Sequence, residues 1–438
     1  MAGVHSSTFD GGSAAASQGR RLLFLQAMPT AFFRALAREL TRRGHKCHRI
    51  NFNGGDRLFW RLPNGVDFRG RPEEWPGFLA QRLAAWRTTD VVLAGDERPL
   101  HRAAVRVATS RGVRVHVFEE GYFRPHWITH ELGGVNGNSR LPPDPGWFRR
   151  EAACLPPLEP PAAVRTSFFR RSIDDVLYNL AALAWQRRYP HYRTHRPWPF
   201  YVEYASWLRR IARAPLAKCR LVRNRRRLGC AAGGHFLFPL QLDSDYQVRR
   251  HSPHGAMAPA LRDVIRSFAA RAPADAVLAV KAHPLDNAMT NWRALARSLA
   301  VEHGVADRIV YLAGGSLESA LAGCRGVVTV NSTAGLAALA QGLPVITLGR
   351  AIYDIAGLTF GGSLDNFWER AEPPDRTIFD AFRRVVMDRT QINGGFYGAA
   401  AVRRAVAGAV AKIERGRQDE ALGADDRLAR TAAATTVV

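Results

Sequence analysis

The chain has 438 residues, which is too long for one ordinary hydrophobic core and fits two domains of about 150 to 200 residues. Hydrophobic residues make up 47% of the sequence and charged residues 23%, so neither a disordered nor a fibrous protein is indicated. The 62 Lys and Arg outnumber the 38 Asp and Glu, and the resulting formal charge of +24 predicts an anionic partner.

The positive charge is concentrated in one segment. Between Arg165 and Leu228 there are 16 Lys or Arg and 3 Asp or Glu, so about half of the net charge lies there. Solvated faces of an Arg-rich protein remain the alternative explanation for the arginines scattered elsewhere.

Cysteine usage and the termini exclude several classes of protein. The 5 cysteines are widely spaced and form no CxxC pair, so neither a disulfide framework nor a zinc ribbon is indicated. Residues 1–19 lack the basic start and apolar run of a signal peptide, so we expect a disordered leader. No stretch reaches the roughly 18 apolar residues of a membrane span. We therefore expect a cytoplasmic protein with at most peripheral membrane contact.

The first part of the chain alternates between predicted strands and helices. Apolar runs predict strands at 21–26, 46–51, 90–94 and 113–118. Helical spacing of apolar residues, as in Phe33, Leu36 and Leu40, predicts helices between these strands. This alternation predicts a mostly parallel, doubly wound sheet in a Rossmann-like domain spanning residues 20–160.

A helical segment and a second alternating block follow. Residues 161–230 have helical periodicity with interleaved Arg and aromatic residues, which predicts a basic helical linker or insert. The second Rossmann-like domain is predicted at 231–395, a closing helix at 396–418 and a disordered tail at 419–438. The strands of this second domain are predicted at 235–240, 276–281, 308–312, 326–330 and 344–348. Two such α/β domains predict a GT-B-like fold, in which a nucleotide sugar lies between the domains.

One turn of the second domain is suited to binding a phosphate. Asn331, Ser332 and Thr333 end a predicted strand and open a helix, so backbone N–H groups and hydroxyls converge on one position. Helix capping by Ser332 or Thr333 is the alternative explanation.

A second turn lies at the same predicted sheet edge. Lys281 and His283 present a cation and an imidazole after a strand, and Pro284 fixes the backbone that holds the imidazole. We interpret both turns as parts of a nucleotide-sugar site. A structural hydrogen bond is the alternative role for His283. The chain has no GxxxxGK[ST] or GxGxxG motif, which argues against a P-loop or standard dinucleotide fold.

Carboxylates follow strands in both domains. Glu119 and Glu120 end the last predicted strand of the first domain, where one of them can face the cleft and stabilise an oxocarbenium-like transition state. An acidic turn paired with Arg124 is the alternative. A second set of candidates follows the first strand of the second domain, namely Gln241, Asp243, Asp245 and Gln247. The spacing of the two aspartates is a weak metal signal, so we expect no metal.

Five motifs together resemble the capsule polysaccharide biosynthesis family of the KpsS/LipB type. They are Phe118-Glu-Glu-Gly-Tyr-Phe-Arg-Pro125, Gly133-Gly-Val-Asn-Gly137, Lys281-Ala-His-Pro284, Val330-Asn-Ser-Thr-Ala-Gly335 and Gly349-Arg-Ala-Ile-Tyr-Asp-Ile-Ala-Gly-Leu-Thr359. The resemblance implies a retaining β-Kdo transferase that uses CMP-Kdo. It also implies that the enzyme starts the Kdo linker of an exported capsule on a (lyso)phosphatidylglycerol at the inner membrane surface.

The resemblance also implies roles for particular residues. His283 and Pro284, with Ser332 and Thr333, match turns on the CMP side. Glu120 falls where related enzymes have Asp in a Glu-Asp-Gly turn, and Glu119 remains an alternative nucleophile. Tyr353 and Asp354 match a loop that closes near the sugar.

The expected partners follow from these assignments. They are CMP-Kdo as donor, an anionic glycerophospholipid, and other capsule synthesis and export proteins, with no nucleic acid and no cofactor. The basic helical segment, with Trp185 and Trp198 among its aromatics, suits a headgroup interface. Three alternatives stay open: a transferase for another nucleotide sugar, an enzyme that extends an existing Kdo linker, and a non-enzymatic polyanion-binding accessory of capsule export.

Overall fold

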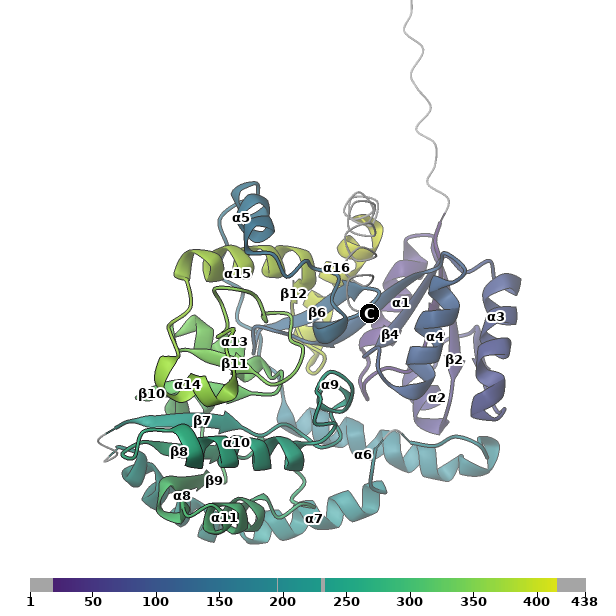
Figure 1. The fold of residues 1–438 in the computed structure, drawn as a ribbon. Coiled ribbons are helices and arrows are strands. Elements are labelled where there is room, and N and C mark those ends of the chain that lie inside the picture. Colours follow the sequence, from purple (N-terminus) through teal and green to yellow (C-terminus); the bar gives the residue numbers. More distant parts are fainter. Residues whose placement is uncertain (1–18, 195, 230–232, 416–438) are drawn as a thin grey trace, which may run out of the picture.

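The computed structural model describes residues 19–194, 196–229 and 233–415 (Figure 1). Within these ranges, no helix is long and apolar enough to cross a membrane. The tail predicted at 419–438, and the leader predicted at 1–19 apart from its last residue, lie outside the described residues.

The first domain contains a seven-stranded sheet in the order β12-β6-β5-β4-β1-β2-β3. Its strands are β1 (Arg21–Phe24), β2 (Lys46–Asn51), β3 (Gly65–Asp67), β4 (Asp90–Ala94), β5 (Arg114–Glu120), β6 (Trp127–Leu132) and β12 (Gln391–Asn393). The first five strands pair in parallel, and β6 and β12 add antiparallel strands beyond β5. The main helices of this domain are α1 (Phe32–Arg42), α2 (Gly54–Trp60), α3 (Trp75–Ala85) and α4 (Pro99–Thr109). The next helix, α5 (Pro145–Ala153), packs instead on α15 (Arg376–Thr390).

The second domain contains a five-stranded parallel sheet in the order β11-β10-β7-β8-β9. Its strands are β7 (His235–Pro239), β8 (Val277–Lys281), β9 (Ile309–Leu312), β10 (Cys324–Thr329) and β11 (Val345–Thr347). Its helices are α9 (Tyr246–Arg250), α10 (Met257–Arg271), α11 (Trp292–Glu302), α12 (Leu317–Leu321), α13 (Thr333–Ala340), α14 (Leu364–Arg370) and α15 (Arg376–Thr390).

The two sheets repeat one strand order. Counted from its own first strand, each parallel sheet reads third, second, first, fourth, fifth. In such a sheet the chain reverses its direction of winding between the first and fourth strands, and ligands bind beyond the carboxyl ends of the strands there. The predicted GT-B-like α/β class is confirmed. Strands β3, β6 and β12 were not predicted, and Glu119 and Glu120 lie inside β5 rather than in a turn.

The end of the chain returns to the first domain. Strand β12 pairs with β6, and α16 (Ala399–Arg415) packs on α1. The range 231–395 predicted for the second domain therefore includes one strand that belongs to the first sheet. The predicted closing helix corresponds to α16.

The predicted insert consists of three helices, α6 (Phe168–Ala184), α7 (Phe200–Ala212) and α8 (Ala214–Gly229), along the lower side of the molecule in Figure 1. Helix α6 packs on α2 of the first domain, and α8 packs on β9 of the second. Arg196 joins the insert internally, because its guanidinium binds Asp175 of α6 and Glu203 of α7. The insert thus spans both domains.

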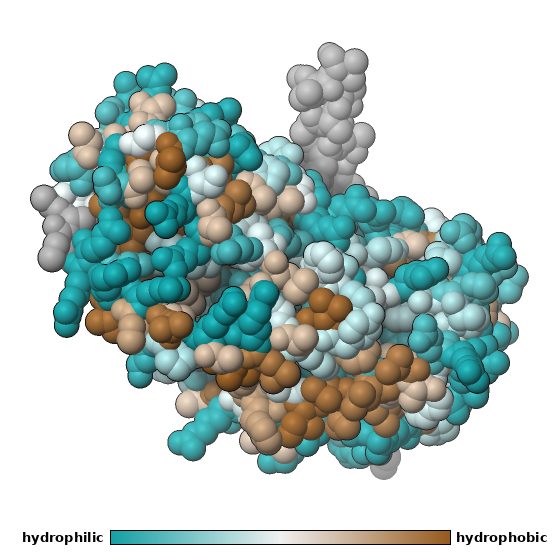
Figure 2. All heavy atoms as spheres, turned by 90° about the horizontal axis from the view of Figure 1, so that it is seen from below, coloured by the Kyte–Doolittle hydropathy of each residue, from teal (hydrophilic) through white to brown (hydrophobic). Residues whose placement is uncertain are grey.

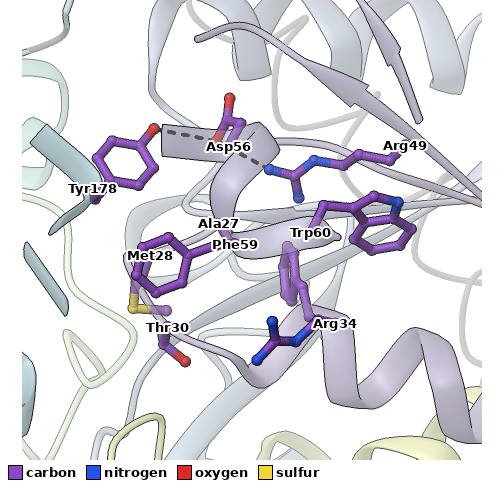
Figure 3. Close-up of a pocket in the computed structure, with 10 residues that line it drawn as sticks. Ala27, Met28, Thr30, Arg34, Arg49, Asp56, Phe59, Trp60 and Tyr178 are labelled. Carbon is purple, nitrogen blue, oxygen red and sulfur yellow. Dashed lines mark hydrogen bonds and ion pairs between the residues drawn. The ribbon is translucent and has the colours of Figure 1, made fainter. Parts of the chain in front are cut away.

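A buried polar cluster fixes α6 to the first domain. The Tyr178 hydroxyl donates to Asp56 at 3.1 Å, and the same carboxylate binds the Arg49 guanidinium at 3.0 Å (Figure 3). The amides of Gln26 and Asn53 each donate to that hydroxyl at 2.8 Å. Removing one partner of a buried ion pair leaves an uncompensated charge and strongly destabilises the fold. We therefore expect this cluster to hold α6 in a fixed position against the first domain.

Two glycines of α2 allow α6 to approach. A Cβ on Gly54 would lie 2.2 Å from the Ala181 carbonyl oxygen, and one on Gly55 would lie 2.6 Å from the Tyr178 ring. The first contact is to backbone, which cannot turn aside. Only glycine at position 54 fits this packing.

Gly54→Ala is expected to displace α6 and to lower the free energy of unfolding of the first domain by about 1–3 kcal/mol, as for other overpacked sites. Gly77→Ala is the matched control, since a Cβ there, in the first turn of α3, meets no atom within 4 Å. That variant is expected to be slightly more stable than the parent, because Ala favours helix. Urea unfolding followed by tryptophan fluorescence measures both. Equal stabilities would contradict the close contact of α2 with α6.

Candidate active site between the two sheets

A carboxyl group of the first domain lies at the junction with the second. Glu119 is half-buried near the end of β5, and a Cβ on Gly95 would lie 3.2 Å from its Oε2. Burial raises the pKa of Glu119 to about 7, Asp245 raises it further, and Arg98 opposes the shift. A carboxyl with this pKa can give or take a proton near neutral pH.

The opposing carboxyl belongs to Asp245. It begins α9, where its Oδ1 accepts the Gln247 N–H at 2.9 Å. Burial raises the pKa of Asp245 as well, while its hydrogen bonds and the Arg124 guanidinium lower it. Two carboxyl groups, one from each domain, therefore have raised pKa values at the junction, and the charge of Asp245 acts on Glu119.

Glu120 lies on the opposite face of β5, since successive side chains of a strand alternate. Its Oε1 accepts Arg171 Nη1 of α6 at 3.2 Å. The Arg171 guanidinium also lies 5.2 Å from the centre of the Tyr397 ring. The structure thus separates the two glutamates: Glu119 faces Asp245, and Glu120 is held in an ion pair.

His283 carries a neutral imidazole with one nitrogen free to donate. Its Nδ1 accepts the Leu285 N–H at 3.1 Å, which assigns the hydrogen to Nε2. Burial lowers the pKa of His283 to about 4, and the nearby positive charges of Arg124 and Lys281 lower it further. Two further cations, Arg171 and Arg210, act in the same direction. A neutral donor among four cations is suited to bind an anion.

The turn around His283 is fixed by the insert. Arg210 of α7 donates to the exposed Pro284 carbonyl at 3.1 Å and also binds the Asp286 carbonyl. Lys281 is buried, and its Nζ lies 3.5 Å from the Gly314 carbonyl oxygen. Burial lowers the pKa of this lysine, with Arg225 and Arg210 acting in the same direction. The positive charge at this sheet edge therefore comes from both the second domain and the insert.

The start of α13 supports the capping interpretation of Ser332. Its hydroxyl accepts the Ala334 N–H at 3.1 Å, and its carbonyl accepts the Tyr353 hydroxyl at 2.5 Å. A Cβ on Gly335 would lie 2.4 Å from that hydroxyl, so Tyr353 is packed directly against the helix. Thr333 is partly buried as the first residue of α13.

Two buried side-chain amides lie where the second sheet reverses its direction of winding, beyond β7 and β10. Gln241 Nε2 donates to Asn331 Oδ1 at 2.9 Å, and its Oε1 accepts the Asn331 N–H at 3.1 Å. Asn331 Nδ2 donates to the Gln247 carbonyl at 2.8 Å. These groups use their hydrogen-bonding capacity on one another, so they position the loops after β7 and β10.

Two candidates lie outside this cluster. Exposed Asp243 accepts the Met257 N–H at 3.2 Å at the start of α10 and the Thr290 hydroxyl at 3.3 Å. Asp354 is exposed, and its Oδ1 accepts the Thr359 hydroxyl at 2.9 Å within its own loop. The structure does not bring either carboxylate to the Glu119–Asp245 pair.

Asn136 joins the two domains. Its amide Nδ2 donates to Gln247 Oε1 at 3.3 Å and to the Asn331 carbonyl at 3.4 Å. Its Oδ1 accepts the Ile352 N–H at 3.1 Å, and its own N–H donates to the Tyr122 hydroxyl at 2.6 Å. One loop of the first domain therefore binds three segments of the second.

Residues 96 and 98 were not predicted as part of the site. Asp96 is buried after β4, its Oδ2 accepts Asn138 Nδ2 at 2.7 Å, and burial raises its pKa. Arg98 donates to the Gln26 amide and the Ala27 carbonyl, each at 3.4 Å, and contributes a positive charge near Glu119. The signal was present in the sequence, because Gly95-Asp-Glu-Arg98 follows a predicted strand whose end lies at the same sheet edge.

Potential metal ligands and one large cavity in the described part of the chain bear on what this cluster of residues could bind. Over the part of the chain that the structure describes, no group of three or more His, Cys, Asp or Glu could hold a metal ion. An open cavity of about 820 Å³ lies instead at the β3 edge, with Asp67 and Arg188 in its wall. The Asp67 carboxylate binds that arginine at 2.9 Å and Arg57 at 3.1 Å, so its charge is balanced by one cation of the insert and one of the first domain.

Comparisons with known proteins place the chain among capsule proteins. A family described as "Capsule polysaccharide biosynthesis protein" matches residues 89–397. The chain is 34% identical to the Escherichia coli "Capsule polysaccharide export protein KpsS" over 86% of its own length and 97% of that relative. It is 33% identical to the Neisseria meningitidis serogroup B "Capsule polysaccharide modification protein LipB", over 86% and 91% of the two chains.

Solved structures with a similar arrangement include the β-Kdo 2,7 transferase of Thermosulfurimonas dismutans KpsC. That match has a TM-score of 0.42 and 12% identity, and it covers 83% of this chain and 89% of the other.

Glu119→Gln is expected to raise the melting temperature at pH 8 and to change it little at pH 5. The folded protein keeps a proton on Glu119 up to about pH 7, whereas an unfolded Glu releases it near 4.5. The stability that this proton contributes is therefore complete below the unfolded pKa and is lost as the pH rises through about 7. Gln removes the cost of burying the carboxylate at pH 8.

The matched control for this experiment is Glu120→Gln. Replacing Glu120 removes its ion pair with Arg171, so no rise in the melting temperature at pH 8 is expected. Differential scanning calorimetry at both pH values makes the comparison. If Glu119→Gln raised the melting temperature equally at pH 5 and pH 8, the increase would not come from removing a buried negative charge.

Proposed function

This chain belongs to the capsule polysaccharide biosynthesis family, as its motifs predicted, and from that membership we propose that it is a CMP-Kdo-dependent glycosyltransferase. The proposed acceptor is a (lyso)phosphatidylglycerol, and the product is the first β-Kdo of the lipid-linked capsule linker. The observation that carries the proposal is that a cationic site around neutral His283 lies at the same domain junction as a carboxyl pair, Glu119 and Asp245.

The cationic site suits the donor. CMP-Kdo carries a phosphodiester and a sugar carboxylate, and Arg124, Lys281 and Arg210 surround His283 with positive charge. His283 Nε2–H would donate to the phosphate, and the N-terminal end of α13, which carries a partial positive charge, lies at the same sheet edge. These groups stabilise the negative charge that develops on departing CMP, so the proposal needs no metal and no cofactor.

The carboxyl pair suits the transfer. In a double displacement, an ionised carboxylate forms a C–O bond to the anomeric carbon while the bond from that carbon to the phosphate oxygen breaks, and CMP leaves with the electron pair. The acceptor hydroxyl then displaces the carboxylate and releases its proton. Glu119, with a pKa of about 7, is suited to take that proton. Asp245 is the carboxylate of the second domain whose charge acts on Glu119, and it is our candidate nucleophile.

Glu120 is less suited to these roles. It was the favoured nucleophile from the motif alone, with Glu119 as the alternative, but Arg171 occupies its carboxylate on the other face of β5. In this proposal Glu120 positions Arg171 beside His283. Gln241, Asn331, Ser332 and Tyr353 likewise hold the loops of the donor site through the bonds described above.

Purified protein incubated with CMP-Kdo and lysophosphatidylglycerol in EDTA is expected to form a Kdo-lipid, detected by mass spectrometry. Glu119→Gln is expected to lower kcat by about 10²–10⁴-fold, the usual contribution of a general acid or base. Asp243→Asn is the matched control and is expected to keep parental activity, since that side chain caps α10.

The outcomes of this assay separate the candidate functions. Absence of any Kdo-lipid product would contradict the proposal. Stabilisation of the protein by UDP but not by CMP would indicate another nucleotide-sugar transferase, because a ligand that binds the folded state raises its stability. Transfer only to a Kdo-bearing acceptor would indicate extension of an existing linker.

A further inference from the structure

Exposed hydrophobic side chains are concentrated on the insert. The described part of the chain exposes 16 large hydrophobic residues, of which 14 lie between Phe168 and Val222. Seen from below, hydrophobic residues gather over much of the face that α6 and α7 occupy in Figure 1 (Figure 2). A patch of this extent marks an interaction surface.

The spacing on α6 forms one continuous stripe. Its exposed members Phe169, Ile173, Val176, Leu180 and Leu183 follow one another three or four residues apart, so they share one face of the helix. Phe169 is 75% exposed. The other face of the same helix holds Tyr178 and Arg171, which bind the first domain. Helix α6 therefore has one face bound to protein and one apolar face left uncovered.

The stripe continues on α7 and α8. Tyr201 and Leu208 are seven residues apart and share a face of α7, and Leu208 is 69% exposed. Ile211 and Leu216 extend the apolar surface across the junction of the two helices. We name these exposed apolar residues of α6, α7 and the start of α8 the insert face.

Positive charge accompanies the insert face. Exposed basic side chains on the insert include Arg187, Arg193, Arg209, Arg213, Lys218, Arg220 and Arg223. The three acidic residues of the insert do not offset them for an outside partner: Asp174 binds Arg170, and Asp175 and Glu203 bind Arg196. A second copy of the chain, with a formal net charge of +24, would be repelled, whereas anionic headgroups are attracted.

We propose that the insert face lies on a bilayer that contains anionic phospholipid. Its apolar side chains would enter the boundary between headgroups and acyl chains, with the basic side chains at the level of the phosphates. The proposal deepens the proposed function and rests on it only for its consequence for the reaction. Helix α6 also carries Arg171, which pairs with Glu120 and whose charge acts on His283, so a docked insert brings the bilayer surface to the side of the site. A lipid acceptor could then react without leaving the membrane completely.

Vesicle co-sedimentation without CMP-Kdo tests the surface apart from the chemistry. The full chain is expected to sediment with vesicles of phosphatidylglycerol mixed with phosphatidylcholine, and more weakly with phosphatidylcholine alone. The variant F169S/L208S is expected to lose about tenfold or more in partition, since two exposed apolar side chains no longer enter the lipid. Val301→Ser is the matched control, because Val301 is 62% exposed on α11, outside the insert. This variant is expected to bind vesicles as the parent does.

Further readouts keep the result interpretable. Unchanged circular dichroism and unchanged stabilisation by CMP would show that the double variant is folded. With a water-soluble glycerophosphoglycerol acceptor, its kcat/KM is expected to equal that of the parent, and only transfer to vesicle-embedded lipid is expected to fall. Vesicle binding without any transfer would uphold the insert face and contradict the proposed function.

Three outcomes would overturn the inference. They are parental vesicle binding by the double variant, an equal loss of binding by the Val301 variant, and no sedimentation of the parent with any vesicle. A parent that is dimeric by light scattering, bound to no vesicle and made monomeric by the double variant, would assign the insert face to contact between copies.

Discussion

The hydrogen bonds of Asn136 determine how the two carboxyl sheet edges meet, and the candidate site depends on that meeting. Asn136 has a φ of 50°, in the left-handed region that asparagine tolerates better than most residues. The next residue has to be glycine, because a Cβ on Gly137 would lie 2.6 Å from the His251 ring. With the loop held this way, Glu119 of β5 and Asp245 at the start of α9 come close enough for the charge of Asp245 to act on Glu119, and burial raises the pKa of both carboxyls.

Much of the fold could be predicted, because strand and helix periodicity is local. The sequence also places Glu119, His283 and Ser332 correctly at strand ends. It could not distinguish Asp243 from Asp245, two residues apart, because their difference lies in partners far along the chain: Asp243 turns to α10, and Asp245 turns to the first domain. The same limit applies to Glu119 and Glu120. They are neighbours in β5, and they differ only in which face of the strand, and therefore which partners, each side chain meets.

The helical insert connects the site to the outside of the molecule. Composition alone identified its positive charge, but a count of arginines does not reveal which ones are already paired. The structure shows that Arg171, Arg196 and Arg210 act inside the protein, on Glu120, on the acidic residues of the insert and on the His283 turn. Exposed basic side chains such as Arg187, Arg193 and Arg213, together with the uncovered apolar stripe, lie on the surface, so one short segment both contributes to an anion site and presents an outer face.

The central claim is that the cationic edge of the second domain binds the CMP phosphate opposite the carboxyl pair. A crystal structure of the protein with CMP tests this directly. The account predicts the phosphate within hydrogen-bonding distance of His283 Nε2 and beside the first turn of α13, with Glu119 and Asp245 facing the side from which the sugar would extend. A phosphate bound far from His283, for example in the open cavity at the β3 edge, would contradict it.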